Sequence, residues 1–221
     1  MPKPVLSSSN NLKFFTGKLT ETELVNCLSD LKHRIFPRPF ERLSSLYGKV
    51  SSYDGGGLIG VEIGVAGGEH ALSLLQSLDI KKIYLIDPYE HYPEYYEGKL
   101  HFGVDQLELE LMEKLAKELL SEYSDKIVWI KEKSSLAINL IKEKVDFVYI
   151  DGNHQYEYIL EDIDNYYPIV KPLGVLGGHD YYNGFQREHD SVVTVVNSFV
   201  VKHNLQLRTE MPDWWIEKAI D

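Results

Sequence analysis

The sequence has little of several features that would each indicate a particular class of protein. Its 221 residues include a single cysteine, Cys27, so no disulfide can form within the chain. The simplest interpretation is a reducing, cytoplasmic location. No apolar run approaches the roughly 20 residues that span a bilayer. The first ten residues also lack the apolar region of a signal peptide. We therefore expect no membrane partner.

Positive charge is scarce as well. Lys and Arg number 23 against 34 Asp and Glu, which gives a formal net charge of −11 and a pI of about 5.2. Because a nucleic-acid backbone is bound through a basic face, we expect no nucleic-acid partner. Internal repeats and low-complexity tracts are missing. The remaining composition is that of an ordinary globular protein and permits small-molecule chemistry.

What the chain does have, after residue 57, is an alternation of apolar strands and amphipathic helices. We expect strands at residues 58–64, 82–86, 126–130, 145–150, 175–178, 205–209 and 214–218. We expect helices at residues 69–78, 104–119, 134–141, 156–167 and 190–203. This alternation predicts a doubly wound α/β fold, with a seven-stranded, mostly parallel sheet, an antiparallel last strand and helices on both faces.

Two further segments complete the expected organisation. Residues 1–57 are expected to form a helical N-terminal extension, since residues 20–23 resemble a capping box and leucines follow at helical spacing. Residues 58–221 are expected to form the ligand-binding domain. The valine-rich stretch 190–203 favours a strand by propensity. Its apolar spacing and the need for a crossover in a parallel sheet favour a helix.

Polar residues stand at the ends of the expected strands and directly after them. In doubly wound sheets, ligands bind at the carboxyl ends of the strands. One acid at such a place is most often turn chemistry or a helix cap, but several together indicate a site. The residues are Glu62, Gly64, Asp87, Ser134, Asp151, His179 and Asp180. Ser134 is also expected to cap the short helix that follows it.

The glycine-rich turn after residue 63 allows two interpretations. A dinucleotide site requires G-x-G-x-x-G, but Ala66 and Glu69 occupy the required positions, and the Glu69 carboxylate would repel phosphates. The alternative ligand is cationic and carries no phosphate. Glu62 can face an ammonium group, and the turn glycines let an amino-acid moiety approach the backbone. Asp87 can accept from both ribose hydroxyls, and Ser134 lies near the expected adenine. This set describes S-adenosylmethionine.

Residues 61–68 resemble the first motif of class I S-adenosylmethionine-dependent methyltransferases, and residues 85–87 resemble the second. Residues 147–156, followed by Asp162, and residues 172–181 are similar to a subgroup of these enzymes. The subgroup comprises small-molecule O-methyltransferases of the macrolide-sugar and cephalosporin-pathway type and, more distantly, catechol O-methyltransferase. The resemblance implies the Rossmann-like methyltransferase fold with its usual strand order. It implies cofactor contacts from Glu62, Gly64, Val65, Gly68, Asp87, Ser134 and Asp151.

The same resemblance implies a place for a divalent ion. Asp151 and Asp180 correspond to acids that hold the metal in the metal-dependent relatives. His179 departs from the pattern, because those relatives generally carry a carboxylate there. Mg²⁺ prefers oxygen ligands, and an imidazole shifts the preference toward manganese, iron or zinc. The expected metal ligands are therefore Asp151, Asp180 and His179, with Mg²⁺ or Mn²⁺ as the candidate ion.

The catalytic candidates are His154, Asp151 and Asp180. His154 can act as a general base or merely orient Asp151, and Asp151 can instead cap the following helix. The predicted function is methyl transfer from S-adenosylmethionine to a hydroxyl of a small molecule. A nicotinamide-dependent oxidoreductase and a non-catalytic, cofactor-binding member of the fold remain alternatives. The aromatic loop 89–102 is either a lid over the acceptor or a packing or dimer contact, so a homo-oligomer stays open.

Overall fold

The structure is a computed structural model that describes residues 38, 40, 57–92, 106–182 and 190–220. The helices expected within residues 1–57 lie outside the described residues. The part of the aromatic loop from residue 93 onward lies outside them too.

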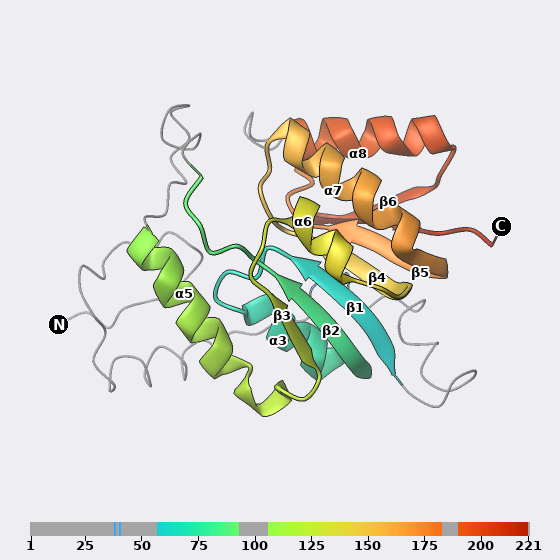
Figure 1. Cartoon of the computed structure of the whole chain (residues 1–221). Coiled ribbons are helices and arrows are strands. Elements are labelled where there is room, and N and C mark those ends of the chain that lie inside the picture. The colour runs from blue at the N-terminus through green and yellow to red at the C-terminus, as the bar shows by residue number, and fades with distance from the viewer. Residues whose placement is uncertain (1–37, 39, 41–56, 93–105, 183–189, 221) are drawn as a thin grey trace.

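A single seven-stranded sheet runs through the described part of the chain (Figure 1). Its strands are β1 Leu58–Ile63, β2 Ile80–Ile86, β3 Ile127–Ile130, β4 Val145–Ile150, β5 Val170–Gly178, β6 Leu207–Glu210 and β7 Asp213–Glu217. The strand order is β3-β2-β1-β4-β5-β7-β6. β1 to β5 pair in parallel, whereas β7 is antiparallel to both β5 and β6. The predicted doubly wound sheet with an antiparallel last strand is confirmed.

Helices cover both faces of this sheet, which explains why its central strands are apolar runs rather than alternating ones. The helices are α3 Glu69–Ser77, α5 Gln106–Leu119, α6 Ser134–Ala137, α7 Tyr156–Tyr166 and α8 Asp190–His203. Short 3₁₀ turns follow at η3 Ser121–Tyr123, η4 Ile138–Leu140 and η5 Tyr167–Ile169. One core cluster joins the sheet to α6, α7 and α8, and the other joins it to α3, α5 and Phe40.

The valine-rich stretch is helix α8, as its spacing predicts. Val192, Val196 and Phe199 are buried against the α7 side of the sheet, while Val201 on the opposite side of the helix is 81% exposed. Packing of one apolar stripe therefore overrides the strand propensity of the individual valines.

Several boundaries differ from the predictions; β2 begins at Ile80 instead of residue 82, for example, and β6 spans Leu207–Glu210 instead of residues 205–209. Two further differences concern a predicted site residue and a longer stretch of chain. Ser134 does not cap α6: the N-cap is Lys133, no side chain caps the helix, and Ser134 is its first residue. β5 begins at Val170 instead of residue 175, because the chain joins the sheet early and then passes Leu173 in a left-handed conformation with φ of 62°. Neither change moves the carboxyl end of a strand.

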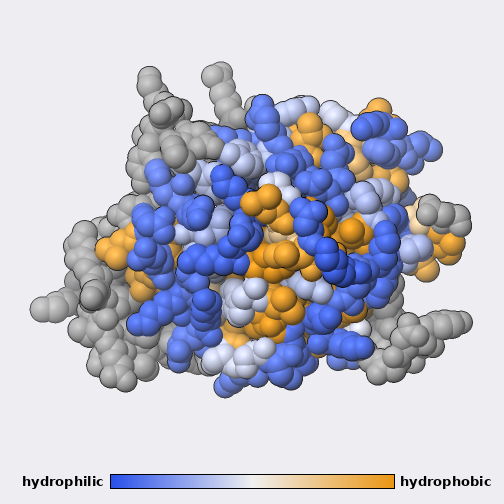
Figure 2. Space-filling view, in the orientation of Figure 1, coloured by the Kyte–Doolittle hydropathy of each residue, from blue (hydrophilic) through white to orange (hydrophobic). Residues whose placement is uncertain are grey.

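Exposed apolar side chains gather on the face formed by α6, η4 and α7. Leu136 and Leu140 are more than half exposed, and Leu160 is 36% exposed. Figure 2 shows apolar atoms over this part of the molecule, with hydrophilic side chains around them. Among the described residues, no helix combines the length and the apolar character needed to cross a membrane.

Candidate active site

The turn after β1 presses against the loop after β4, at the point where the strand order reverses. Gly64 has φ of 84°, and a Cβ there would lie 2.1 Å from the carbonyl oxygen of Asp151. Gly68, with φ of 86°, forms the left-handed N-cap of α3. Only glycine meets the steric and the conformational demand at position 64. The predicted cofactor turn and the predicted catalytic loop are therefore direct neighbours.

Asp87, at the end of β2, holds this turn by its backbone. Its Oδ2 accepts hydrogen bonds from the Val65 and Ala66 N–H groups at 2.9 and 3.0 Å, and its Oδ1 accepts one from the Tyr89 N–H at 2.8 Å. Burial raises the pKa of Asp87, and these three backbone donors oppose the rise. The sequence placed Asp87 against ribose hydroxyls. In the structure this carboxylate binds the backbone of the turn and so fixes its shape. It retains acceptor capacity for a further hydrogen bond.

Glu62 points into the core beneath the turn. It is 1% exposed, and its Oε1 lies 3.1 Å from Nδ1 of His70 in α3. The His70 ring packs on Tyr149 at a centroid distance of 4.0 Å, and burial lowers the pKa of His70, so the ring is neutral. The sequence predicts that Glu62 faces an ammonium group of the ligand. In the structure its carboxylate contacts the side chain of His70, which belongs to the protein itself.

Ser134 lies at the start of α6, after β3. Its carbonyl oxygen accepts a hydrogen bond from the Tyr166 hydroxyl at 2.8 Å. Its side chain contacts Asp162 of α7, which is 2% exposed and whose pKa burial raises to about 7. The carboxyl ends of the parallel strands lie along one edge of the sheet, which we call the strand-end edge. The predicted cofactor residues form one half of this edge, the cofactor half, which runs from β3 through β2 and β1 to β4.

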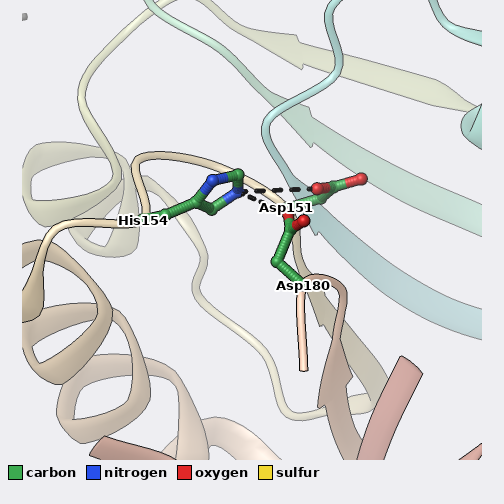
Figure 3. A group of neighbouring side chains, drawn as sticks. All are labelled: Asp151, His154 and Asp180. Atoms are coloured by element: carbon green, nitrogen blue, oxygen red, sulfur yellow. Dashed lines mark ion pairs between the residues drawn. The ribbon is translucent and has the colours of Figure 1, made fainter. Parts of the chain in front are cut away.

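The other half of the edge is a charged cluster at the ends of β4 and β5 (Figure 3). His154 Nε2 forms ion pairs with Asp180 Oδ2 at 2.8 Å and with Asp151 Oδ1 at 3.8 Å. His179 Nδ1 lies 3.2 Å from the same Asp180 oxygen and 3.8 Å from the same Asp151 oxygen. All four predicted residues of this region therefore meet at one point.

Backbone strain helps to assemble this cluster. Asp180 has φ of 61°, a left-handed conformation that costs a residue with a Cβ roughly 1–2 kcal/mol. The strain places the Asp180 carboxylate, which is 10% exposed, between the two imidazoles. Strained residues of this kind collect at functional sites.

Within the cluster, the carboxylates and the imidazoles stabilise one another's charged forms. Burial alone would raise the pKa of Asp180, but its bonds to His154 and His179 outweigh burial and hold that pKa well below its usual range. Burial would lower the pKa of His154, but Asp151 and Asp180 raise it to about 10. His154 is therefore an imidazolium at neutral pH in this arrangement. The general-base role predicted for it requires that the pairing with the two carboxylates be released first.

This donor set fits a metal ion of a particular kind. Asp151, His154 and Asp180 each offer one ligand atom, and these atoms all lie within 4.8 Å of one another. His154 thus joins the two acids that the sequence selected, with His179 beside them. Two carboxylate oxygens and an imidazole nitrogen suit manganese, iron or zinc better than Mg²⁺.

The alternative role of Asp151 as a helix cap is wrong. The N-cap of α7 is Gln155, and no side chain caps that helix. The Gln155 N–H is instead bonded to Asn153 Oδ1 at 3.0 Å. The Asp151 carboxylate instead contacts His154 and His179 of the cluster and one further partner residue that the sequence did not suggest.

That partner is Arg38, from the N-terminal extension. Its Nη1 donates to Asp151 Oδ2 at 3.0 Å and to the Tyr149 hydroxyl at 2.8 Å. The Arg38 and Asp151 positions are 113 residues apart in the chain, so no local pattern links them. The one sequence signal is that Arg38 stands between Pro37 and Pro39, which restrict the backbone around it.

The described beginning of the aromatic loop belongs to the cofactor half of the edge. Tyr89 is 2% exposed, and its hydroxyl donates to the Ala66 carbonyl oxygen at 2.9 Å. The Tyr92 ring packs edge-on against Tyr158 of α7, and Lys133 Nζ lies 5.2 Å from its centroid. The described beginning of the loop, which follows β2, thus contacts the glycine turn at Tyr89 and helix α7 at Tyr92. The lid and dimer-contact hypotheses concern residues outside the described part and stay predictions.

Comparison with known proteins gives one family match. A model described as a methyltransferase domain matches residues 61–181, which include both halves of the edge. No protein of curated function matches the sequence.

Solved structures share the fold at low identity. The O-methyltransferase NovP superposes with a TM-score of 0.58 at 14% identity, over 89% of this chain and 81% of that one. The Streptococcus mutans protein SMU.1697c, in complex with SAH, has a TM-score of 0.56 at 17% identity, over 83% of this chain and 99% of that one. The SAH-bound Podospora anserina methyltransferase PaMTH1 has a TM-score of 0.54 at 13% identity, over 96% and 94% of the two chains.

Proposed function

The chain belongs to the methyltransferase domain family, and from this we propose that it moves a methyl group from S-adenosylmethionine to a hydroxyl of a small molecule. The observation that carries the proposal is the contact between Gly64 and Asp151. It joins a backbone turn suited to a cofactor with a cluster of ionisable side chains suited to handling a proton. A methyl donor and an acceptor hydroxyl must meet at such a junction.

The charge of the cofactor half supports S-adenosylmethionine over a dinucleotide. Asp87 and Glu62 lie at or beneath the turn, and Glu69 begins α3 directly after it. Three acids around one helix N-terminus disfavour a pyrophosphate, whose binding relies on that end being positive. They favour a ligand that carries a sulfonium and an ammonium group. SAH is the molecule bound in the S. mutans and P. anserina structures.

Methyl transfer to oxygen needs alignment and loss of a proton, without a covalent enzyme intermediate. Alignment follows from the rigid turn on one side and the fixed carboxylates on the other. Asp151 and Asp180 hold their charges at the ends of adjacent strands. His154 takes the proton of the acceptor hydroxyl only after it has lost its own proton and its pairing with the two carboxylates has been released. A divalent ion on Asp151, His154 and Asp180 would displace the proton of His154 and would lower the pKa of the acceptor hydroxyl.

Calorimetry followed by a transfer assay tests this function. We expect SAH to bind, NAD(P) to bind weakly or not at all, and labelled methyl to pass to some members of a panel of phenols, sugars and hydroxy acids. The assay is run with Mn²⁺, with Mg²⁺ and with a chelator. Tight NAD(P) binding without SAH binding would support the oxidoreductase. SAH binding without transfer to any acceptor would support the non-catalytic alternative.

A further inference from the structure

We propose that Arg38 is a positioning residue, delivered by the N-terminal extension, that fixes which oxygen of Asp151 faces the proposed metal cluster. The inference rests on the proposed function, because it gives that cluster a ligand geometry. It concerns a part of the chain that lies outside the residues 61–181 matched by the family model. The extension would then be part of the site itself.

Phe40 anchors the extension to the sheet. Its side chain is 0% exposed, and its ring lies 4.9 Å from Tyr149 and 5.9 Å from Phe147, edge-on in both cases. A Cβ on Gly177 of β5 would come within 2.6 Å of the Phe40 ring, so the glycine makes room for it. The backbone N–H of Phe40 also donates to Asp213 Oδ2 at 3.3 Å. Two residues before this anchor, the chain reaches the cluster.

A buried relay fixes the direction of Arg38. The Tyr149 hydroxyl donates to Asp213 Oδ1 at 2.9 Å, and both side chains belong to residues that are 0% exposed. Because the hydroxyl proton is committed to Asp213, its oxygen is available to accept from Arg38 Nη1. The guanidinium therefore cannot leave Tyr149 without giving up this hydrogen bond. The same nitrogen is bonded to Asp151 Oδ2.

This arrangement divides the two oxygens of Asp151. Oδ2 belongs to Arg38 at 3.0 Å, whereas Oδ1 is the oxygen that faces His154 and His179. Asp151 then offers an ion one oxygen in a set direction. Because arginine stays charged at ordinary pH, Arg38 does not lose its ion pair with Oδ2 through its own titration.

The orienting effect of Arg38 and its positive charge should change the metal affinity in opposite directions, so the two effects can be separated by mutation. Loss of a partner that orients a metal ligand typically lowers metal affinity about 10- to 100-fold. Loss of a positive charge near the ion should raise that affinity. Arg38→Gln removes both position and charge. Tyr149→Phe leaves every charge in place but removes the hydroxyl that aims Arg38, and Arg38→Lys keeps the charge without the rigid fork.

The experiment is calorimetric titration of MnCl₂ into the SAH-saturated protein. We expect Arg38→Gln to weaken Mn²⁺ binding about tenfold or more, and Tyr149→Phe and Arg38→Lys to weaken it by smaller factors. Two matched controls should leave the Mn²⁺ affinity unchanged. Arg208→Gln removes an arginine paired with Glu217 at the far edge of the sheet, and Tyr84→Phe removes a hydroxyl bonded to Glu143. SAH affinity and melting temperature verify that each variant is folded.

Three results would overturn the inference. Tighter or unchanged Mn²⁺ binding in Arg38→Gln would mean that the arginine acts through charge or not at all. An unchanged Mn²⁺ affinity in both Tyr149→Phe and Arg38→Lys would mean that the orientation of the Arg38 guanidinium does not affect metal binding. Failure of the wild-type protein to bind Mn²⁺ while it binds SAH would leave nothing to position. Failure of the wild type to bind SAH is a different result, which counts against the proposed function.

Discussion

The two halves of the strand-end edge use carboxylates in opposite ways. In the cofactor half, Asp87 accepts from three backbone N–H groups and its pKa is raised by burial. In the charged half, Asp180 is paired with two imidazoles, which outweigh burial and hold its pKa low. The first arrangement builds a surface from backbone groups, and the second builds a charged cluster from side chains. A fold can therefore keep the first while changing the second to suit another acceptor.

The halves also differ in where their parts come from. The glycine turn, Asp87 and Ser134 follow one another along consecutive strand-to-helix units. The charged half needs Arg38 from before the sheet, Asp151 after β4 and Asp180 after β5. The residues of the first half therefore follow one another in order along the sequence, although their contacts form only in the folded chain. The residues of the second half are spread from position 38 to position 180.

The largest effect should come from breaking the contact between the halves with Gly64→Ala. The new Cβ would lie 2.1 Å from the Asp151 carbonyl oxygen, at a φ of 84°. We expect a loss of about 3 kcal/mol in the free energy of unfolding, in the range of severe single substitutions, measured by urea titration, together with loss of SAH binding.

Gly67→Ala is the matched control for Gly64→Ala. There the nearest atom to a new Cβ is the flexible end of the Glu69 side chain, at 2.8 Å. We expect less than about 1 kcal/mol of destabilisation. Equal effects of the two substitutions would contradict the assignment of Gly64 as the junction.

The charged half should be separable from the cofactor half by Asp180→Asn. Asparagine tolerates the left-handed φ of 61° at this position, so the backbone is preserved. We expect loss of Mn²⁺ binding and a fall in methyl transfer of roughly 100-fold, the usual range for a lost acid–base group. SAH affinity by calorimetry should stay within about twofold. Transfer that survives both the substitution and a chelator would contradict the role of the cluster.

A smaller effect, seen in the pH dependence of stability, should come from Asp162 behind Ser134. The pKa of Asp162 is 3.8 when unperturbed and about 7 in the folded protein. Between these values the folded protein keeps a proton that the unfolded chain has released, so stability falls as pH rises and the penalty is complete above about pH 7. Asp162→Asn should therefore stabilise the protein by about 2 kcal/mol at pH 8.5, roughly half of the ~4 kcal/mol to which the full pKa difference corresponds, and hardly at all at pH 3.5.

Asp164→Asn, at an exposed position of the same helix, is the control for this measurement. Urea titrations of both variants at the two pH values check the prediction. A gain for Asp162→Asn that is the same at both pH values would show that the carboxyl group does not titrate as proposed.

The sequence was sufficient for most of the fold and for the residues at the strand ends. Apolar runs bounded by Gly64, Asp87 and Asp151 located the central strands, and the spacing of the valines located α8 despite their strand propensity. These signals are local, with a period of one turn or one pleat. The boundaries at Ser134 and Val170 were missed because capping and early pairing depend on neighbours in space.

The partners within the site could not be predicted in the same way. Nothing in the sequence shows that Asp87 would be engaged by the turn backbone, or that His154 would lie closer than His179 to Asp180. Arg38 and Phe40 depend on contacts with Asp151 and Asp213, more than a hundred residues further along the chain. Such contacts leave no periodicity in the sequence.

The fit of Phe40 over Gly177 bears on how this enzyme scaffold can be transplanted or shortened. A chain begun at residue 58 would keep the seven strands of the described sheet. It would lack Phe40, which would leave a cavity over β4 and β5 and would remove the backbone N–H that donates to Asp213. The portable unit therefore starts upstream of the first strand, before Arg38. Anyone grafting a new acceptor specificity onto this sheet would need to carry that short piece of chain along with it.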